Sequence, residues 1–377
     1  MTAGQVDQGG LEAVSAVDRI PALTGVRALA ATLVVATHAA YTTGKYTHGY
    51  AGLVYSRMEI GVPIFFALSG FLLFGPWVAA AKAGAPDPSV RRYAWRRFRR
   101  IMPAYAVTVL AAYLLYHFRT AGPNPGHSWY GLLRNLTLTQ IYTDNYAFAL
   151  LHQGLTQMWS LAVEVAFYAA LPVLASLLLV VVCRRQWRPG LVLAWLAGLT
   201  LISPAWMVLV HTTDVLPDGS KLWLPGYLAW FTGGMMLSVL AATGARCYGF
   251  VAVPLALLCF LIVSTPIAGE PTTSPSGLAQ ALVKVGFYAA IAALIIAPPA
   301  LGDSGWYTRF LASRPMVWLG EISYEIFLVH LIVLEIAMVE VLRWPVYTGS
   351  MPALFVVTMA LSIPVAWVLH RFTRVRS

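Results

Sequence analysis

The sequence predicts an all-α integral membrane protein, a bundle of about ten transmembrane helices with both termini in the cytoplasm. Of its 377 residues, 59% are hydrophobic and only 11% are charged, and the mean hydropathy is +0.71. A soluble domain could not bury that much apolar surface. The chain also contains repeated apolar runs of about twenty residues, the length that spans a bilayer. No segment alternates polar and apolar residues over strand length with regular turns, which disfavours a membrane β-barrel.

Ten apolar segments support this prediction, and an even number of spans places both termini on one side of the membrane. We expect a cytoplasmic tail at residues 1–21, one transmembrane domain at 22–370 and a short basic cytoplasmic tail at 371–377. No cleaved signal is expected, because the first twenty residues lack a cationic start and an apolar core. The ten segments begin near Ala22, Ile60, Ile101, Trp159, Gly190, Trp223, Phe250, Leu278, Val317 and Met351.

The distribution of Lys and Arg fixes the expected orientation. With the N-terminus inside, seventeen of these residues fall in cytoplasmic segments and six in outer ones, and Arg27 and Lys284 remain within the membrane. This bias follows the positive-inside rule. The net charge of +10 therefore reflects membrane topology, and we expect no nucleic-acid partner. The three cysteines show no metal-ligand spacing, so no metal site is expected either.

Two ionisable residues interrupt the first apolar segment. Arg27 and His38 are eleven residues apart, which puts them on nearly the same helix face and about 16 Å apart along the axis. Because charged side chains are costly in hydrocarbon and usually face a bundle interior, the pair indicates a functional site. An intramembrane His can also be a helix–helix hydrogen-bonding residue, and that alternative stays open for His38.

A run of arginines follows the second segment. Six of them lie between Arg91 and Arg100, at the expected inner membrane surface. Arg forks bind phosphates bidentately, so the run is suited to a polyanion. It also fits a cytoplasmic loop that orients the chain and contacts anionic lipid. On the outer side, residues 129–142 are expected to include a short amphipathic helix that covers a cavity mouth.

Five sequence blocks occur in the order typical of one family. They are Arg27-x10-His38, GVPIFFALSGFLL at 61–73, RRFRRIMPAY at 96–105, WSLAVEVAFY at 159–168 and GEISYEIFLVH at 320–330. On these residues the chain resembles the membrane acyltransferase-3 family. It departs from many relatives in having Val165 and Ala166 after Glu164, where a second acidic residue is common. We also expect no C-terminal hydrolase-like domain, which some relatives carry.

The resemblance implies an O-acyltransferase of the plasma (inner) membrane. Such enzymes move an acyl group, commonly acetyl or succinyl, from cytosolic acyl-CoA to a hydroxyl of an extracytoplasmic or lipid-linked acceptor. We expect a glycan or glycolipid acceptor, with a macrolide-type small molecule as the alternative. Acyl-CoA is then a co-substrate, and no tightly bound cofactor is expected. The bilayer is the remaining partner.

The resulting hypothesis assigns a role to each candidate residue. The phosphates of coenzyme A rest on Arg27, Arg96, Arg97 and Arg100, while His38 acts as general base. Glu164 orients the imidazole or stabilises its cation, as a triad carboxylate does. By helical rise His38, His330 and Glu164 fall at a similar depth. Acceptor-binding or supporting roles are expected for Ser69, Trp159, Tyr168, Ser323, Tyr324 and His330.

Other interpretations remain. Glu164 and His330 could be structural, and Gly70 in the SGF block could serve close helix packing. A proton-coupled transporter would also contain buried Arg, His and Glu, although no repeated pair of broken helices is visible. A lipid- or glycan-binding scaffold would release no thiol from acetyl-CoA.

Overall fold

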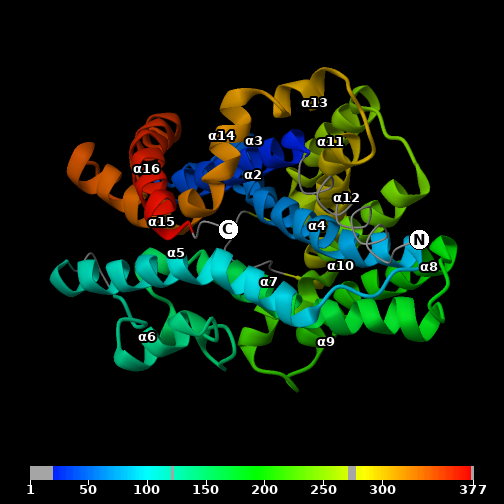
Figure 1. The fold of residues 1–377 in the computed structure, drawn as a ribbon. Coiled ribbons are helices and arrows are strands. Elements are labelled where there is room, and N and C mark those ends of the chain that lie inside the picture. The colour runs from blue at the N-terminus through cyan, green and yellow to red at the C-terminus, as the bar shows by residue number, and fades with distance from the viewer. Residues whose placement is uncertain (1–19, 120–122, 271–276, 375–377) are drawn as a thin grey trace.

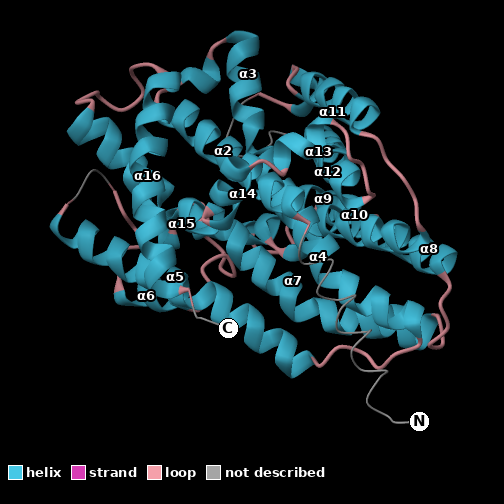
Figure 2. Cartoon of the chain, turned by 45° about the horizontal axis from the view of Figure 1, so that its top comes forward, coloured by secondary structure: helices cyan, strands magenta, loops and turns pink. Residues whose placement is uncertain are grey.

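The computed structural model describes residues 20–119, 123–270 and 277–374, and within these ranges every regular element is helical (Figures 1 and 2). The longest helices are α2 (Pro21–Thr42), α4 (Gly61–Ala83), α5 (Val90–Phe118), α7 (Met158–Ser176), α10 (Leu224–Thr243), α12 (Leu278–Ala300) and α16 (Met351–Thr373). Shorter ones are α3 (Gly49–Arg57), α6 (Trp129–Leu136), α8 (Pro189–Thr200), α9 (Ile202–Thr212), α11 (Gly249–Val263), α13 (Trp306–Leu311), α14 (Arg314–Glu321) and α15 (Ser323–Ile336). The all-α membrane fold is thus confirmed.

The number of spans is less definite than the fold class. Within the described residues, eight helices are long and apolar enough to cross a membrane. A ninth span is formed if Arg314–Glu321 and Ser323–Val341, which meet at a bend of 69°, are counted together. The remaining predicted segment is α11, whose fifteen residues extend only about 22 Å, short of a roughly 30 Å hydrocarbon core. The count of ten and the cytoplasmic position of both termini stay predictions.

Helix α2 lies at the centre of the bundle. It packs against α4 and α12 on one side and against α14, α15 and α16 on the other (Figure 1). Most of its residues are small or β-branched and fully buried, so neighbouring helices approach it closely. Arg27 near its start and His38 near its end therefore both lie inside the protein, as their spacing predicts.

Glycines allow the closest helix crossing, that of α4 with α10. A Cβ added to Gly70 would lie 2.1 Å from the carbonyl oxygen of Phe231, and one added to Gly234 would lie 1.8 Å from that of Ala67. No side chain fits at these points, so the two backbones are in direct contact. This confirms the packing role expected for Gly70, and it fixes the position of the adjacent Ser69.

The arginine run is helical, which corrects the expectation of a loop. Helix α5 begins at Val90, and the side chain of Ser89 caps it by accepting a hydrogen bond from the backbone N–H of Arg92 at 3.4 Å. A Ser at the N-cap is a strong start signal, because it satisfies a free N–H of the first turn. The arginines therefore form the first three turns of a 29-residue helix and project at fixed angles from its axis.

Two further expectations concern the outer loop and the tails. The amphipathic segment is present as α6, which packs against α5. Of the expected 1–21 tail, residues 1–19 lie outside the described residues, as do 375–377 of the C-terminal tail, while α16 extends to Thr373.

Candidate active site

Two adjoining cavities enter the bundle beside α2. The deeper one, which we call the inner cavity, includes Glu164 in its lining and has about 870 Å³ of empty volume. The one nearer the surface, which we call the outer cavity, includes Arg96 and Arg99 and has about 1200 Å³. Five residues line both of them, namely Arg27, Arg100, Gly320, Glu321 and Tyr324. The two cavities therefore adjoin at these residues, one of them near the surface and the other deeper in the bundle. A Cβ on Gly320 would lie 2.0 Å from the carbonyl oxygen of Thr24, so this glycine lets α14 approach α2 at the junction.

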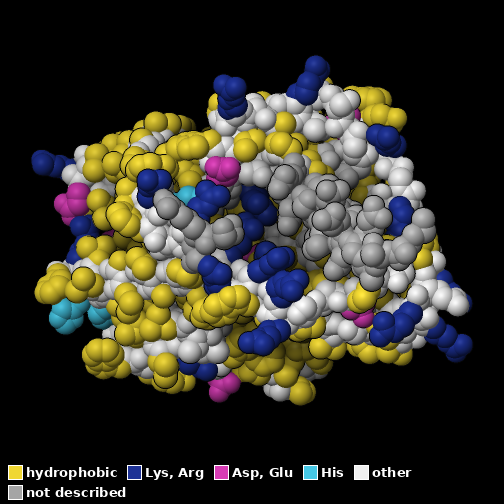
Figure 3. Space-filling view, in the orientation of Figure 1, with side chains coloured by type: hydrophobic (Ala, Val, Ile, Leu, Met, Phe, Trp, Pro, Cys, Tyr) yellow, Lys and Arg dark blue, Asp and Glu magenta, His cyan; other side chains and the backbone are white. Residues whose placement is uncertain are grey.

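The spacing of the arginines along α5 determines which cavity each of them lines. Arg97 and Arg100 are three residues apart, on one face, and line the inner cavity together with Arg27. Arg96 and Arg99 line the outer cavity. Figure 3 shows basic side chains gathered around a hollow on this face of the molecule. Such a concentration of guanidinium groups attracts and binds anions such as phosphates.

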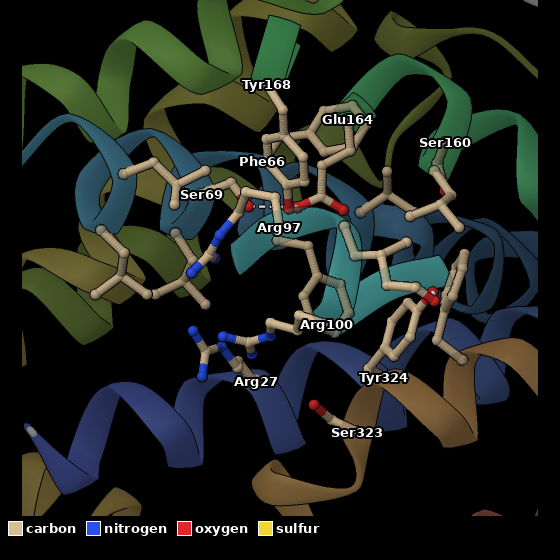
Figure 4. A pocket seen from close by; sticks show the side chains of 18 of the residues that line it. Arg27, Phe66, Ser69, Arg97, Arg100, Ser160, Glu164, Tyr168, Ser323 and Tyr324 are labelled. Atoms are coloured by element: carbon tan, nitrogen blue, oxygen red, sulfur yellow. Dashed lines mark hydrogen bonds between the residues drawn. The ribbon is translucent and has the colours of Figure 1, made fainter. Parts of the chain in front are cut away.

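Glu164 forms the polar end of the inner cavity. Its Oε1 accepts hydrogen bonds from the hydroxyl of Ser69 and, at 2.6 Å, from the hydroxyl of Tyr168. Figure 4 shows this group bordering the space that the guanidinium groups of Arg27, Arg97 and Arg100 enter. The three predicted residues Ser69, Glu164 and Tyr168 are thus brought together by α4 and α7. The carboxylate of Glu164 provides a counter-charge for the arginines.

His38 has a different partner from the one expected. Its Nδ1 lies 2.7 Å from the carbonyl oxygen of Val34, and because a carbonyl can only accept, Nδ1 carries the proton. The lone pair of neutral His38 is therefore on Nε2. His330 donates from Nδ1 to the carbonyl oxygen of Phe327 at 2.7 Å, and its own Nε2 lies 3.3 Å from Nδ1 of His38.

The hydrogen bonds of Glu164 thus correct the expectation that this carboxylate orients His38. Within the described residues, Glu164 binds Ser69 and Tyr168, and no hydrogen bond joins it to either histidine. Phe327 lines the inner cavity, and its ring lies 6.0 Å from the ring of His330, which in turn lies 5.0 Å from that of His38. The histidine pair therefore lies beyond Phe327, outside the lining of both cavities.

Of the remaining predicted residues, two line the inner cavity and one packs outside it. Ser323 and Tyr324 line the inner cavity, and their hydroxyls donate to the carbonyl oxygens of Gly320 at 2.8 Å and Ile101 at 3.1 Å. Trp159 does not line it, and its ring packs 5.2 Å from that of Tyr227. The structure also reveals Glu321, which lines both cavities.

Sequence reasoning missed a second polar cluster near His38. Glu59 lies in a short 3₁₀ turn (Met58–Ile60) that packs against α2, and it forms an ion pair with Lys284 of α12. A Cβ added to Gly61, which follows this turn, would lie 2.3 Å from the carbonyl oxygen of Ala30 and 2.7 Å from a methyl group of Val34, so the turn lies about one helical turn from His38. The available signal was Lys284 itself, since a lone Lys in an apolar helix implies a carboxylate partner.

The fold and the cavities define a multi-pass membrane protein with arginine-lined cavities that lead to a buried carboxylate. Residues 20–371 match the acyltransferase domain family Acyl_transf_3. This chain belongs to that acyltransferase family. The match confirms the resemblance seen in the five sequence blocks, and it assigns acyl transfer rather than transport.

Two curated relatives support the assignment. The chain is 30% identical to the acyltransferase MdmB of Streptomyces mycarofaciens over 329 residues, which cover 84% of this chain and 79% of the relative. It is 24% identical to the peptidoglycan O-acetyltransferase OatA of Listeria monocytogenes over 335 residues. That alignment covers 82% of this chain but only 49% of the relative, so the chain spans about half the length of that protein. No solved structure matches the chain significantly.

Proposed function

We propose that this enzyme transfers an acetyl or succinyl group from cytosolic acyl-CoA to a hydroxyl of a glycan or glycolipid acceptor at the plasma (inner) membrane. The observation that carries the proposal is the pair of adjoining cavities, which share Arg27 and Arg100. Their lining is basic near the surface, at Arg96 and Arg99, and includes Glu164 in the interior, an arrangement that suits a ligand with a polyanionic head and a slender uncharged arm.

The arginines bind the head of the donor. Arg96 and Arg99 line the outer cavity, and Arg97 the inner one, so phosphates can be held from the mouth to the junction at Arg100 and Arg27. Acyl-CoA carries a pyrophosphate and a ribose phosphate, and guanidinium forks bind such groups bidentately. The pantetheine arm then extends into the inner cavity, toward Phe327.

His38 supplies the base. Its Nε2 takes the proton from the acceptor hydroxyl as the oxygen attacks the thioester carbon, and the imidazolium returns that proton to the thiolate of coenzyme A as the carbon–sulfur bond breaks. His330 fixes the tautomer and orientation of His38. In this proposal Glu164 positions Ser69 and Tyr168 and balances the charge of the arginines, and it does not contact the base.

The acceptor reaches His38 from the end of α2 opposite Arg27. A glycan is favoured because one relative is named as a peptidoglycan O-acetyltransferase. With the donor entering at the arginines, donor and acceptor approach from opposite ends of α2, on which Arg27 and His38 are about 16 Å apart along the axis.

Purified protein in lipid nanodiscs tests this function. Acetyl-CoA and chitotetraose are added, and free thiol is measured with a chromogenic disulfide. The mass of the oligosaccharide is then measured by mass spectrometry. We expect thiol release coupled to a mass gain of one acetyl group, and loss of both with His38→Ala. Thiol release without acylated sugar would exclude the glycan acceptor, and no thiol release with either acetyl-CoA or succinyl-CoA would exclude the donor.

A further inference from the structure

The cluster around Glu59 has the features of a ligand subsite. It is built at the end of α2 that carries His38, from the 3₁₀ turn Met58–Ile60 and helix α12. The ammonium group of Lys284 forms an ion pair with Oε1 of Glu59, and the hydroxyl of Tyr288 donates to the same oxygen at 2.8 Å. Lys284 also lies 5.7 Å from the centre of the Tyr288 ring. These contacts hold the carboxylate in one orientation.

A second cation supports the same carboxylate. Arg57 is 2% exposed, and its guanidinium donates to the carbonyl oxygens of Val263 and Ala268 at 3.1 Å and to that of Gly269. These bonds anchor Arg57, which directly precedes the 3₁₀ turn that carries Glu59, to residues 263–269.

One oxygen of this carboxylate is left available. Both Lys284 and Tyr288 contact Oε1, and within the described residues Oε2 of Glu59 accepts no hydrogen bond. The side chains of Glu59 and Lys284 are 29% and 18% exposed, so a ligand can reach them. An ionised carboxylate is an acceptor only, and its free oxygen is a site for a donor such as a hydroxyl.

The surroundings of Glu59 narrow the class of ligand. The hydroxyl of Tyr288 donates to it, and the ring of Tyr288 lies 6.0 Å from that of Trp230. The ring of Tyr227 lies 5.2 Å from that of Trp159 and 4.9 Å from that of Trp230. A free carboxylate oxygen beside aromatic faces suits a polyhydroxylated ring, whose hydroxyls donate to the oxygen and whose C–H face packs on the aromatic groups.

We propose that Glu59, held by Lys284 and Tyr288, is the acceptor subsite. Its Oε2 accepts a hydrogen bond from a sugar hydroxyl that neighbours the hydroxyl deprotonated by His38. This inference rests on the proposed function and specifies which residues bind the acceptor. Glu59 thereby discriminates a polyol from a simple alcohol, because only the polyol offers a second hydroxyl.

The test compares Glu59→Gln with Glu335→Gln. Glu335 is a matched control, because it also accepts a hydrogen bond from a tyrosine, Tyr116, and pairs with a cation, Arg119, but it lies at the junction of α5 and α15. For Glu59→Gln we expect the KM for chitotetraose to rise about ten- to a hundredfold, the range for a hydrogen bond to a charged group. The KM for acetyl-CoA should stay unchanged, and the loss with hexanol, which has one hydroxyl, should be much smaller than the loss with chitotetraose.

Two results would overturn the subsite. One is an unchanged KM for chitotetraose, and the other is an equal loss with chitotetraose and hexanol, which would make the Glu59–Lys284 pair structural. Direct binding of chitotetraose, measured by calorimetry without any donor, separates this inference from the proposed function. Weakened binding in Glu59→Gln supports the subsite even if no acyl group is transferred. Equal binding, or none to the unmodified protein, refutes it.

Discussion

Nε2 of His330 lies 3.3 Å from Nδ1 of His38, although 292 residues separate them in the sequence. His330 is fully buried, and its Nδ1 is committed to the carbonyl oxygen of Phe327. It can therefore only accept from His38. Together with the carbonyl of Val34, it keeps the proton of His38 on Nδ1 and leaves Nε2 as the basic atom, which makes His330 a positioning residue.

Substitutions of His330 test this relationship. His330→Gln retains an acceptor, whereas His330→Leu has similar bulk and none. We expect kcat to fall about fivefold in His330→Leu and less in His330→Gln, since a net hydrogen bond contributes about 1 kcal/mol. The KM for acetyl-CoA should not change in either variant. Equal kcat values in the two variants, with unchanged thermal transitions, would contradict a role for the accepting nitrogen.

Arg27 is expected to bind the donor. Arg27→Ala should weaken the affinity for coenzyme A about tenfold or more, because a hydrogen bond to a charged group is worth about 1.5–3 kcal/mol. Arg91→Ala is the control, since this exposed arginine lines neither cavity found in the described chain. Calorimetry measures the affinity of both variants for coenzyme A. If the two substitutions weaken binding equally, nonspecific charge rather than the cavity junction holds the donor.

Gly234 is expected to be essential for packing of α10 on α4. Gly234→Ala places a Cβ 1.8 Å from the carbonyl oxygen of Ala67, whereas a Cβ on the adjacent Gly233 meets no described atom within 4 Å. Overpacking of this kind typically costs about 1–3 kcal/mol, and a helix-interior Gly→Ala change without a clash stabilises by about 0.5–1 kcal/mol. In thermal unfolding in detergent, only Gly234→Ala should have a lower transition temperature than the unmodified protein. A drop of similar size in Gly233→Ala would argue against the close crossing.

His152 is expected to make stability depend on pH. This residue lies in the outer loop, and its buried ring packs 4.4 Å from that of Tyr113. Burial, with a smaller contribution from His127, lowers the pKa of His152 to about 4. In the unfolded chain the pKa is about 6.5, so between these values the unfolded state binds more protons and stability falls as the pH falls.

The corresponding measurement is the thermal transition at pH 7.5 and pH 5. The transition temperature should fall on acidification, and it should fall less in His152→Gln, which cannot take up a proton. An identical fall in the two proteins would assign the acid sensitivity to other groups.

Much of the fold could be predicted from the sequence because apolar runs and close-packing glycines are local signals. Gly70 and the amphipathic helix α6 were predicted in this way. The helical state of the arginines was also accessible, from Ser89 as an N-cap.

The pairing of residues across the bundle could not be predicted in this way. Helical rise placed His38, His330 and Glu164 at a similar depth, but depth says nothing about which way each helix is rotated. That rotation decides that His38 contacts His330 and that Glu164 contacts Ser69 and Tyr168. For the same reason Glu59 could not be matched to Lys284, which is 225 positions away in the sequence.

The approach of donor and acceptor from opposite ends of α2 is tested most directly by transfer across a membrane. Protein is reconstituted into vesicles that enclose chitotetraose, and acetyl-CoA, which does not cross the bilayer, is added outside. We predict acetylated chitotetraose inside the vesicles, with none when His38→Ala replaces the unmodified protein. Product formed only when donor and acceptor are on the same side would contradict the proposed path.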